Sequence, residues 1–356
     1  MTRFERGVRM SPLGSHHPLH SLCLRVDIAN PHIGFDFFTN DSTRETSSYN
    51  DLMAIVDCVS RDTDATGYGI WYWSDRAFLA GGSFSGAGFH NLRSGFSRRN
   101  IISNCYFSDP GNAQHSIKLY GAMYTGNGVA SGQVSQYNII SDCRFKAAPG
   151  DAIQVALETM NDAGNMRLHD TIFERNYTTA DGSGLTLRVA GYGITIRNNL
   201  FDISGSRFRQ AVELHHRAIG VAPVTRDMHV YNNTIFDRSD RSSTGVSVRD
   251  GVVDSRIFNN LVHTAGSSGS RVTEFGDGVN TRSENNILAT DSARHWFEST
   301  PPSDPTDWRP IGTSRVVDAT LDSTPVFEDF EGNLRPVDGD NSGSATSDIG
   351  AFEFLP

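Results

Sequence analysis

Long apolar runs, paired cysteines and an excess of positive charge are all missing from this chain of 356 residues. No segment approaches the ~18 consecutive apolar residues of a membrane-spanning helix. The four cysteines include no Cys-x-x-Cys pair, which excludes a disulfide scaffold, a zinc ribbon and a thioredoxin-type site. Asp and Glu number 41 against 31 Lys and Arg, and the net charge of −10 argues against duplex DNA or an anionic membrane as the main partner.

Common catalytic and targeting signatures are missing as well. The sequence contains no P-loop, no G-x-S-x-G and no H-E-x-x-H, so nucleotide-binding, esterase and zincin functions have no support. The first residues, MTRFERGVRMSPLG, lack the apolar stretch of a signal peptide. Aromatic residues at 10% and charged residues at 20% exclude a disordered chain, and 34 glycines indicate many turns.

An internal repeat dominates what is present. Eight segments end in a bulky apolar residue, and they align on Phe84, Phe107, Phe145, Phe173, Phe201, Phe236, Val262 and Leu288. The same alignment brings a turn residue of each segment into one register: Gly81, Asn104, Asp142, Asp170, Asn198, Asn233, Asn259 and Asn285. Self-similarity in short units of variable spacing indicates a repeat architecture, with loops that absorb the differences in length.

A second kind of strand recurs between these segments. It covers 69–73, 90–94, 115–121, 152–157, 184–189, 211–216 and 245–250, and each copy alternates apolar and polar residues with a period of two. No long helical pattern separates successive strands. Parallel strands need a crossover, and without helices the chain can supply it by coiling, with one turn of a solenoid per repeat.

These repeats resemble those of the right-handed parallel β-helix proteins of the pectate-lyase-like superfamily. The resemblance covers roughly 68–290, and the Asn-rich register resembles the amide ladders that join successive coils in that superfamily. The closing SATSDIGAFEF (344–354) is similar to the tail that often ends such proteins. The resemblance implies an all-β fold, a single-stranded right-handed parallel β-helix of about eight coils, one for each aligned segment.

Three segments follow from this interpretation: an N-terminal segment and cap (1–67), the β-helix (68–290) and a C-terminal irregular extension (291–356) that packs on the solenoid. Within 47–62, Leu52, Ile55, Val56 and Val59 have helical spacing. Because a solenoid needs its open end covered, we expect an N-terminal capping helix there.

The cysteines have a structural interpretation. Cys105 and Cys143 occupy one register of adjacent coils, which lie ~4.8 Å apart. We expect two buried thiols, because in-register parallel geometry suits a disulfide poorly. Cys23 and Cys58 lie outside the repeats, and whether they pair is left open.

The second strands place outward residues in columns. With Ile70, Leu92, Ile117, Ile153, Leu185, Val212 and Val246 aligned as inward residues, the first column reads Trp71, Arg93, Lys118, Gln154, Thr186, Glu213 and Ser247. The second column reads Trp73, Gly95, Tyr120, Ala156, Arg188, His215 and Arg249. Four Lys and Arg side chains stand against one carboxylate, which favours an anionic ligand on an otherwise acidic protein. The alternative is a solvated strand face without function.

An acidic polysaccharide fits such a face, because arginine grips carboxylates and aromatic faces stack on sugars. For a uronate chain, β-elimination needs a base, a group that stabilises the enolate-like charge and an acid for the leaving oxygen. We assign Lys118 or His215 as the base, Tyr120 as the acid and Arg188 as the carboxylate neutraliser. Trp71, Trp73, Arg93, Gln154, Glu213 and Arg249 are the predicted substrate-binding residues. Trp71 and Trp73 have an alternative role in packing against the N-terminal cap.

One segment adds a further resemblance. GLTLRVAG (184–191) is similar to a segment of the alginate lyase and chondroitinase B group of polysaccharide lyases, in which the arginine is catalytic and the base is a lysine on a neighbouring coil. The resemblance therefore assigns the role of the catalytic arginine to Arg188. Val189 stands where that group has histidine, and Val155 and Ala156 stand where the lysine is expected. That group also has a calcium site, so Ca²⁺ is the cofactor that the resemblance allows.

Other functions stay open at this point. His90 and His115, with Asp151, share one register and are either metal ligands or stacked residues at a bend; stacking is favoured. A glycoside hydrolase needs two carboxylates ~5–9.5 Å apart, and Glu213 is the single acid in the columns. A uronate epimerase or a non-catalytic glycan-binding protein are the remaining alternatives. We expect a monomer with no nucleic-acid or membrane partner, secreted or periplasmic as the resemblance implies.

Overall fold

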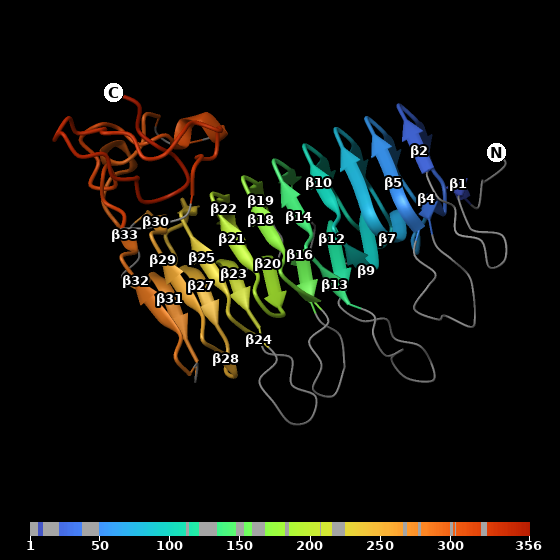
Figure 1. Cartoon of the computed structure of the whole chain (residues 1–356), viewed down its shortest axis with the longest axis horizontal. Coiled ribbons are helices and arrows are strands. Elements are labelled where there is room, and N and C mark those ends of the chain that lie inside the picture. Colours follow the sequence, from blue (N-terminus) through green and yellow to red (C-terminus); the bar gives the residue numbers. More distant parts are fainter. Residues whose placement is uncertain are drawn as a thin grey trace.

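The computed structural model describes residues 6–9, 21–37, 50–111, 114–120, 134–146, 153–158, 168–181, 185–206, 208–215, 225–265, 269–276, 279–299, 302, 304–321 and 326–356. The described chain coils into a parallel β-helix whose strands stack along one long axis, with the first coils and the C-terminal segment at opposite ends (Figure 1). All named strand pairs are parallel, as a solenoid of successive coils requires. The all-β fold class and the parallel β-helix are therefore confirmed.

Three strand ladders form the faces of the β-helix. We call the first the site ladder; it comprises β1 (Arg6–Arg9), β4 (Ile33–Phe37), the first part of β7 (Tyr68–Ala80), β9 (Leu92–Arg98), β12 (Ile117–Tyr120), β16 (Ile153–Glu158), β20 (Leu185–Ala190), β23 (Gln210–Leu214), β27 (Thr244–Val248) and β31 (Arg271–Phe275). The second ladder comprises β2 (Ser21–Leu24), β5 (Asn50–Val56), the last part of β7, β10 (Ile101–Ser103), β14 (Ile139–Ser141), β18 (Ile172–Glu174), β21 (Thr195–Arg197), β25 (His229–Tyr231), β29 (Arg256–Phe258) and β32 (Arg282–Glu284).

The third ladder is a separate ten-stranded sheet with one strand per coil. It comprises β3 (Asp27–Ala29), β6 (Val59–Arg61), β8 (Ser83–Ser85), β11 (Tyr106–Ser108), β15 (Arg144–Lys146), β19 (Tyr177–Asp181), β22 (Leu200–Gly205), β26 (Thr234–Asp237), β30 (Leu261–Thr264) and β33 (Ile287–Ala289). Four short strands complete the described coils: β13 (Ser135–Gln136), β17 (Leu168–His169), β24 (Thr225–Arg226) and β28 (Val252–Val253). The described helices are two 3₁₀ turns, η1 (Ala293–His295) and η2 (Pro305–Trp308).

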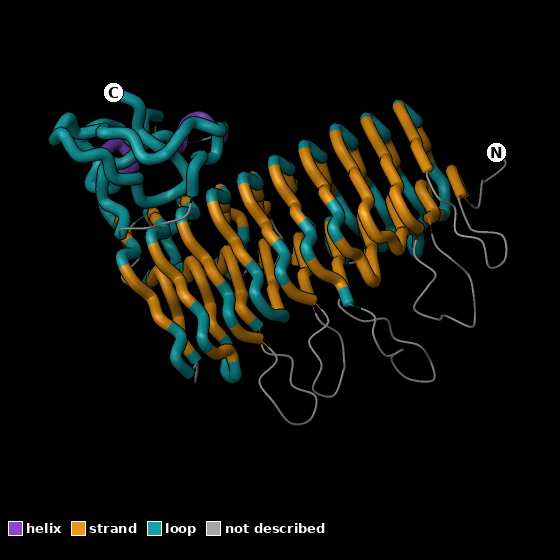
Figure 2. The backbone as a smooth tube through the Cα atoms, viewed as in Figure 1, coloured by secondary structure: helices purple, strands orange, loops and turns teal. Residues whose placement is uncertain are grey.

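The solenoid begins earlier than residue 68, and the predicted capping helix over 47–62 is wrong. Residues of that segment form β5 and β6, which pair with β7 and β8 (Figure 2). Met53 and Ile55 are buried in the core, whereas Leu52 is exposed. The apolar residues therefore follow the period of a strand, which a short window cannot separate from helical spacing. The strands β3 and β6 add two coils to the eight that the repeat alignment indicated.

Tight corners separate the ladders. At the corner between the second ladder and the ten-stranded sheet, one residue per coil has a positive φ: Arg25, Asp57, Gly81, Asn104, Asp142, Arg175, Asn198, Asn232, Asn259 and Asn285. Gly, Asn and Asp tolerate this left-handed conformation best, which explains their recurrence in the sequence. The corner directs the chain from one face to the next and so sets the register of each coil.

A ladder of amides follows this corner one residue later. Asn199 donates through its Nδ2 to Asn233 Oδ1 at 2.9 Å, and Asn233 donates in the same way to Asn260 at 2.9 Å. The ladder runs through Asn176, Asn199, Asn233, Asn260 and Asn286. Each amide satisfies its buried neighbour, so the interior can hold polar side chains without loss of hydrogen bonds. The predicted amide ladder exists, with its register shifted by one residue at Asn198, Asn259 and Asn285.

The phenylalanine register is right in part. Phe84, Phe107 and Phe145 stack inside the β-helix with ring centroids 5.4 and 5.3 Å apart. Phe173, however, pairs with Ile140 in the second ladder, and the partner of Phe145 in the next coil is Thr178. Phe201 pairs with Ile235, so Phe236 lies one residue beyond its predicted position. The alignment over Phe173 and Phe236 is therefore wrong.

The C-terminal extension packs beside the last coils. Trp296, Phe297 and Trp308 form a second apolar cluster with Phe236 and Leu261 of the ten-stranded sheet. Buried hydrogen bonds anchor the closing tail: Arg335 donates to the carbonyl oxygens of Asp348 and Gly350 at 3.3 and 3.0 Å. Among the described residues, no helix is long and apolar enough to cross a membrane.

Candidate functional site

The outer face of the site ladder carries one column of residues in direct register. Lys118 pairs with Arg93 in the preceding coil and with Ala156 in the following coil, and Ala156 pairs with Arg188. The described column reads Asp36, Trp71, Arg93, Lys118, Ala156, Arg188, Glu213, Ser247 and Glu274. The predicted alignment of Ile153 and Leu185 as inward residues is therefore wrong by two positions, because Val155 and Leu187 pair with Ile117 and Val212.

A stack of rings supports the first part of this column. Tyr68, His90 and His115 occupy one position in three successive coils, with centroid distances of 5.8 Å between Tyr68 and His90 and 5.1 Å between the two histidines. The planes of the histidines differ by 12°. Both histidines are buried. The stacking interpretation of His90 and His115 is thus confirmed, while Asp151 lies outside the described residues.

His115 holds the ammonium group of Lys118. Its Nδ1 lies 2.6 Å from the carbonyl oxygen of Ile153, which can only accept, so Nδ1 carries the proton. Nε2 therefore presents a lone pair, and Lys118 Nζ donates to it at 3.2 Å. One imidazole tautomer thereby fixes where the lysine head group lies. We call the residues Tyr68, Trp71, His90, Arg93, His115 and Lys118 the cation wall.

Burial and neighbouring cations keep both histidines neutral. Desolvation, followed by the charge of Lys118, lowers the pKa of His115 to about 3. Desolvation, followed by His115, Lys118 and Arg93, lowers the pKa of His90 well below its usual range. His90 accepts a hydrogen bond at Nδ1 from the backbone N–H of His115 at 3.2 Å, as a neutral imidazole can. The cation wall thus has a positive local potential and no histidine that titrates near neutral pH.

Arg93 is packed against aromatic rings. Its guanidinium carbon lies 5.5 Å from the ring centroids of both Tyr68 and Trp71, and its Nη1 donates to the Tyr68 hydroxyl at 2.7 Å. The ring centroids of Tyr68 and Trp71 lie 5.0 Å apart. Cation–π packing orients the guanidinium without neutralising it. Arg93 and Lys118 are neighbours on adjacent strands, which lie ~4.8 Å apart.

Arg188 has a different setting. Its Nε donates to Glu158 Oε1, and the Glu158 side chain is fully buried. Arg188 pairs in register with Glu213, whereas His215 follows Leu214, the partner of Val189. The expectation that Arg188 and His215 share one column is therefore wrong. Arg188 is also two coils, about 10 Å, from Lys118.

A pocket of about 430 Å³ opens further along the same face. It is lined by His215, Ser247, Val248, Arg249, Asp250, Glu274, Phe275 and Gly276. Beside it, Glu213 accepts from Arg249 Nε at 2.9 Å and Nη2 at 2.7 Å, and His215 Nδ1 lies 3.5 Å from Glu213 Oε1. Three predicted residues, Glu213, His215 and Arg249, are thus brought together. We call this region the carboxylate pocket.

The remaining predicted residues have other outcomes. Gln154 is fully buried, and its Nε2 donates to the carbonyl oxygen of Thr179 inside the β-helix. The prediction that Gln154 contacts substrate is therefore wrong, because its position faces the interior at the corner of the coil. The side chains of Trp73 and Tyr120 lie outside the described residues.

Sequence reasoning missed three residues that shape the site. Tyr68 and His115 hold Arg93 and Lys118, and Glu158 holds Arg188. His115 had a usable signal, since it lies three residues before Lys118 on the same strand segment and shares its register with His90. Glu158 had none, because it lies one residue beyond the predicted strand 152–157 and contacts Arg188 on the next coil.

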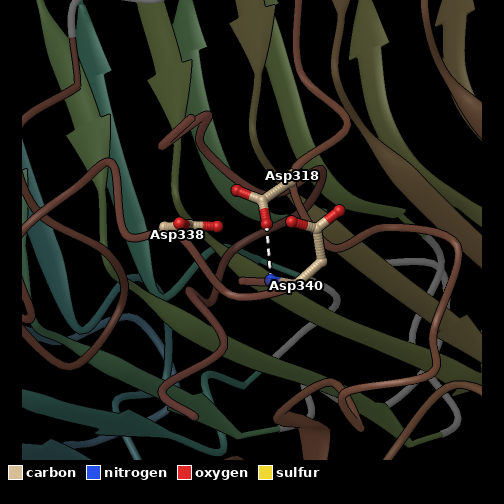
Figure 3. Close-up of side chains that lie close together, drawn as sticks. All are labelled: Asp318, Asp338 and Asp340. Atoms are coloured by element: carbon tan, nitrogen blue, oxygen red, sulfur yellow. Dashed lines mark hydrogen bonds between the residues drawn. The ribbon is translucent and has the colours of Figure 1, made fainter. Parts of the chain in front are cut away.

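A cluster of carboxylates lies in the C-terminal extension. One oxygen each of Asp318, Asp338 and Asp340 lies within 4.8 Å of the others (Figure 3). Oxygen donors of this kind suit Ca²⁺. The same carboxylates already accept backbone N–H groups, as Asp318 does from Asp340 at 2.8 Å and Asp338 from Gly343 at 2.9 Å. The cluster therefore has a complete structural role in shaping this turn.

Comparison with known proteins found similar solved structures. No protein-family model and no curated protein matches the sequence. The chain is similar to an alginate lyase from Paenibacillus sp. str. FPU-7 at 16% identity and a TM-score of 0.48, over 78% of this chain and 88% of that chain. It is similar to an exopolygalacturonase from Thermotoga maritima at 13% identity and a TM-score of 0.48, over 77% and 81%.

A third similar structure is pectate lyase Pel9A, at 13% identity and a TM-score of 0.46, over 92% of this chain and 87% of that chain. These likenesses concern the fold alone, which the strand pairing establishes independently. The parallel β-helix that the predicted resemblance implied is confirmed by the strand pairing. Because one fold hosts many activities, the function has to be argued from the site.

Proposed function

We propose that the chain is a polysaccharide lyase that cleaves a uronic-acid-containing polysaccharide by β-elimination at the cation wall. The observation that carries the proposal is the Ile153–His115–Lys118 chain of hydrogen bonds, which fixes a lysine head group beside an arginine on the adjacent coil. Successive sugars of an extended chain recur every ~5 Å, close to the spacing of the coils. One uronate carboxylate can therefore meet Arg93 while the ring it belongs to lies over β12.

Lys118 is the proposed base. In the unprotonated form that a base requires, the amine can still donate one N–H to His115 Nε2, which leaves its lone pair for the substrate. It removes the proton on the carbon next to the uronate carboxylate, and the electron pair of that C–H bond becomes the new C=C bond as the glycosidic C–O bond breaks. His115 does not take this proton onward, because its pKa is about 3.

Arg93 is the proposed carboxylate neutraliser, in place of Arg188. The charge that develops on the carboxylate in the transition state is stabilised by a guanidinium that is already oriented by Tyr68 and Trp71. Arg188 is committed to the buried carboxylate of Glu158. Tyr120, two residues after Lys118 in β12, keeps its assignment as the acid that returns a proton to the leaving oxygen, on its place in the strand alone.

The test is a screen of acidic polysaccharides, namely alginate, pectate, glycosaminoglycans and ulvan. A lyase produces an unsaturated uronate whose conjugated C=C–carboxylate absorbs in the ultraviolet. We expect this absorbance with at least one of these polymers and its loss in Lys118→Ala. New reducing ends without the absorbance would contradict elimination, and binding without either product would leave a glycan-binding protein.

A second candidate is a glycoside hydrolase at the carboxylate pocket. The observation that favours it is that Asp250 and Glu274 line one hollow and Glu213 lies beside it, where acid and base carboxylates of a hydrolase would be needed. The exposed ring of Phe275 gives the same pocket a face for sugar stacking. Loss of reducing-end production in Glu274→Gln, with Lys118→Ala unaffected, would favour this function over the lyase.

A further inference from the structure

The first coils carry an apolar groove on the outer face of the second ladder. Leu22, Ala54, Phe78 and Ile101 are successive partners in one column, and Leu22, Phe78 and Ile101 are exposed. Ala54 is too small to fill the space between Leu22 and Phe78. The result is a hollow of about 470 Å³, with Leu52, Arg76 and Arg99 along its corner side.

The C-terminal extension shows what covers this kind of face. On the last coils, Tyr231 of β25 and Phe258 of β29 lie on the outer face of the same ladder, and Val326 packs against both. The chain continues into a hairpin over 327–335, closed by the pairing of Glu328 with Leu334 and by a hydrogen bond from the N–H of Arg335 to the carbonyl oxygen of Phe327 at 2.9 Å. The extension is thus built to lie along the second ladder.

The hairpin over 327–335 carries apolar side chains that no other part of the described chain covers from solvent. Among the large apolar residues of the described chain, Phe327 is 77% exposed, Leu334 is 71% exposed and Leu22 follows at 62%. A soluble surface rarely concentrates such exposure without a partner. Two exposed apolar side chains thus project beside the last coils, and one apolar hollow lies beside the first coils.

The charges around the two features are opposite in sign. Arg76 and Arg99 line the groove, and Arg98 and Arg99 both pair with one aspartate, Asp75. The hairpin carries Glu328, which is half exposed and lies 3.8 Å from Arg175, and Glu331, which pairs with Arg309 at 2.6 Å. Arginines at the hollow and glutamates on the hairpin favour one orientation of approach.

We propose that the groove of Leu22, Ala54, Phe78 and Ile101 binds the hairpin over 327–335 of a second copy of this chain. The two surfaces differ, so the contact is heterologous. They also lie at opposite ends of the long axis (Figure 1). Repetition of the contact therefore adds copies head to tail and extends the outer face of the ladder, in contrast to the monomer expected from the sequence. The proposal does not depend on the proposed enzymatic activity.

Sedimentation velocity of the full chain tests the contact at protein concentrations up to ~1 mM, the upper end of weak affinities. We expect the weight-average sedimentation coefficient to rise with concentration and to fall again at high salt. Two variants separate the surfaces: Phe327→Asp with Leu334→Asp removes the projections, and Phe78→Asp disrupts the groove. Each variant alone is expected to stay monomeric, whereas the control Phe208→Asp, at an exposed ring elsewhere, associates like the parent chain.

An equimolar mixture of the two variants gives the decisive result. One partner keeps an intact groove and the other an intact hairpin, so the mixture forms a one-to-one dimer that cannot grow further. Leu22→Asp, at the most exposed part of the groove, replaces Phe78→Asp if the latter melts early. A parent chain that stays monomeric at every concentration, or a mixture in which no dimer forms, would overturn the proposal.

Discussion

Cations on the site ladder occur in two settings. In the cation wall, Arg93 and Lys118 are held by a phenol, aromatic rings and a neutral imidazole. Further along the same face, Arg188 and Arg249 are held by the carboxylates of Glu158 and Glu213. Contacts with rings and an imidazole orient a cation on the outer face, whereas an ion pair with a buried carboxylate makes the cation part of the fold. Equal residue types in one register can therefore have unequal roles.

The largest expected effect is on activity at Lys118. Lys118→Ala should lower kcat/KM for elimination by about 10²–10⁴-fold, the usual contribution of a general base. Arg249→Ala, in the carboxylate pocket, should lower it by less than about tenfold through substrate binding. Initial rates of ultraviolet absorbance measure both variants. Equal losses would remove the distinction between the two settings.

Stability should show the reverse pattern. Arg188→Ala leaves the charge of Glu158 buried without its partner, which should cost about 3–5 kcal/mol in the free energy of unfolding. Lys118→Ala removes a hydrogen bond to a neutral imidazole and should cost about 1 kcal/mol. Urea unfolding gives the values. The double variant Arg188→Ala with Glu158→Gln should recover most of the loss, and failure to recover would show that the cost arises elsewhere.

A smaller effect concerns pH and the buried imidazole of the cation wall. In the unfolded chain His115 takes up a proton near pH 6.5, whereas in the fold its pKa is about 3. The unfolded state therefore binds more protons between these values, and stability falls as the pH drops through this window. Between pH 6.5 and 5 the loss should be about 1–2 kcal/mol.

His115→Gln tests this origin, because glutamine has no such titration. Denaturant midpoints at both pH values should lie closer together in His115→Gln than in the parent chain, while Lys118→Ala should keep most of the difference. An unchanged difference in His115→Gln would assign the acid sensitivity to other groups.

The fold was predictable because its signal repeats. Phe84, Phe107 and Phe145 occupy one inward column, and left-handed corners select Gly, Asn and Asp, so the sequence displays both in register. Asp170 shows the limit of this signal. It also has a left-handed φ, yet it lies at the other corner, beside β17 and β18, so an Asp followed by an apolar residue does not reveal which corner it occupies.

The site residues were predictable only on strands whose register could be read from the sequence. Trp71, Arg93 and Lys118 were aligned correctly, because Ile70, Leu92 and Ile117 are unambiguous inward residues. In β16, Ile153 and Val155 are both apolar, and the wrong choice concealed the pairing of Glu158 with Tyr120 in register. Hydrogen bonds between side chains of adjacent coils that are far apart in the sequence, such as that of Arg188 with Glu158, have no local sequence signal at all.

The most direct measurement of the central claim is a crystal structure of Lys118→Ala with a bound uronate oligosaccharide. The account predicts one uronate carboxylate at Arg93, with the proton-bearing carbon next to that carboxylate at the position that the Lys118 amine vacates on β12. An oligosaccharide seated in the carboxylate pocket, with no sugar over β9 and β12, would contradict the assignment of the cation wall as the reacting site.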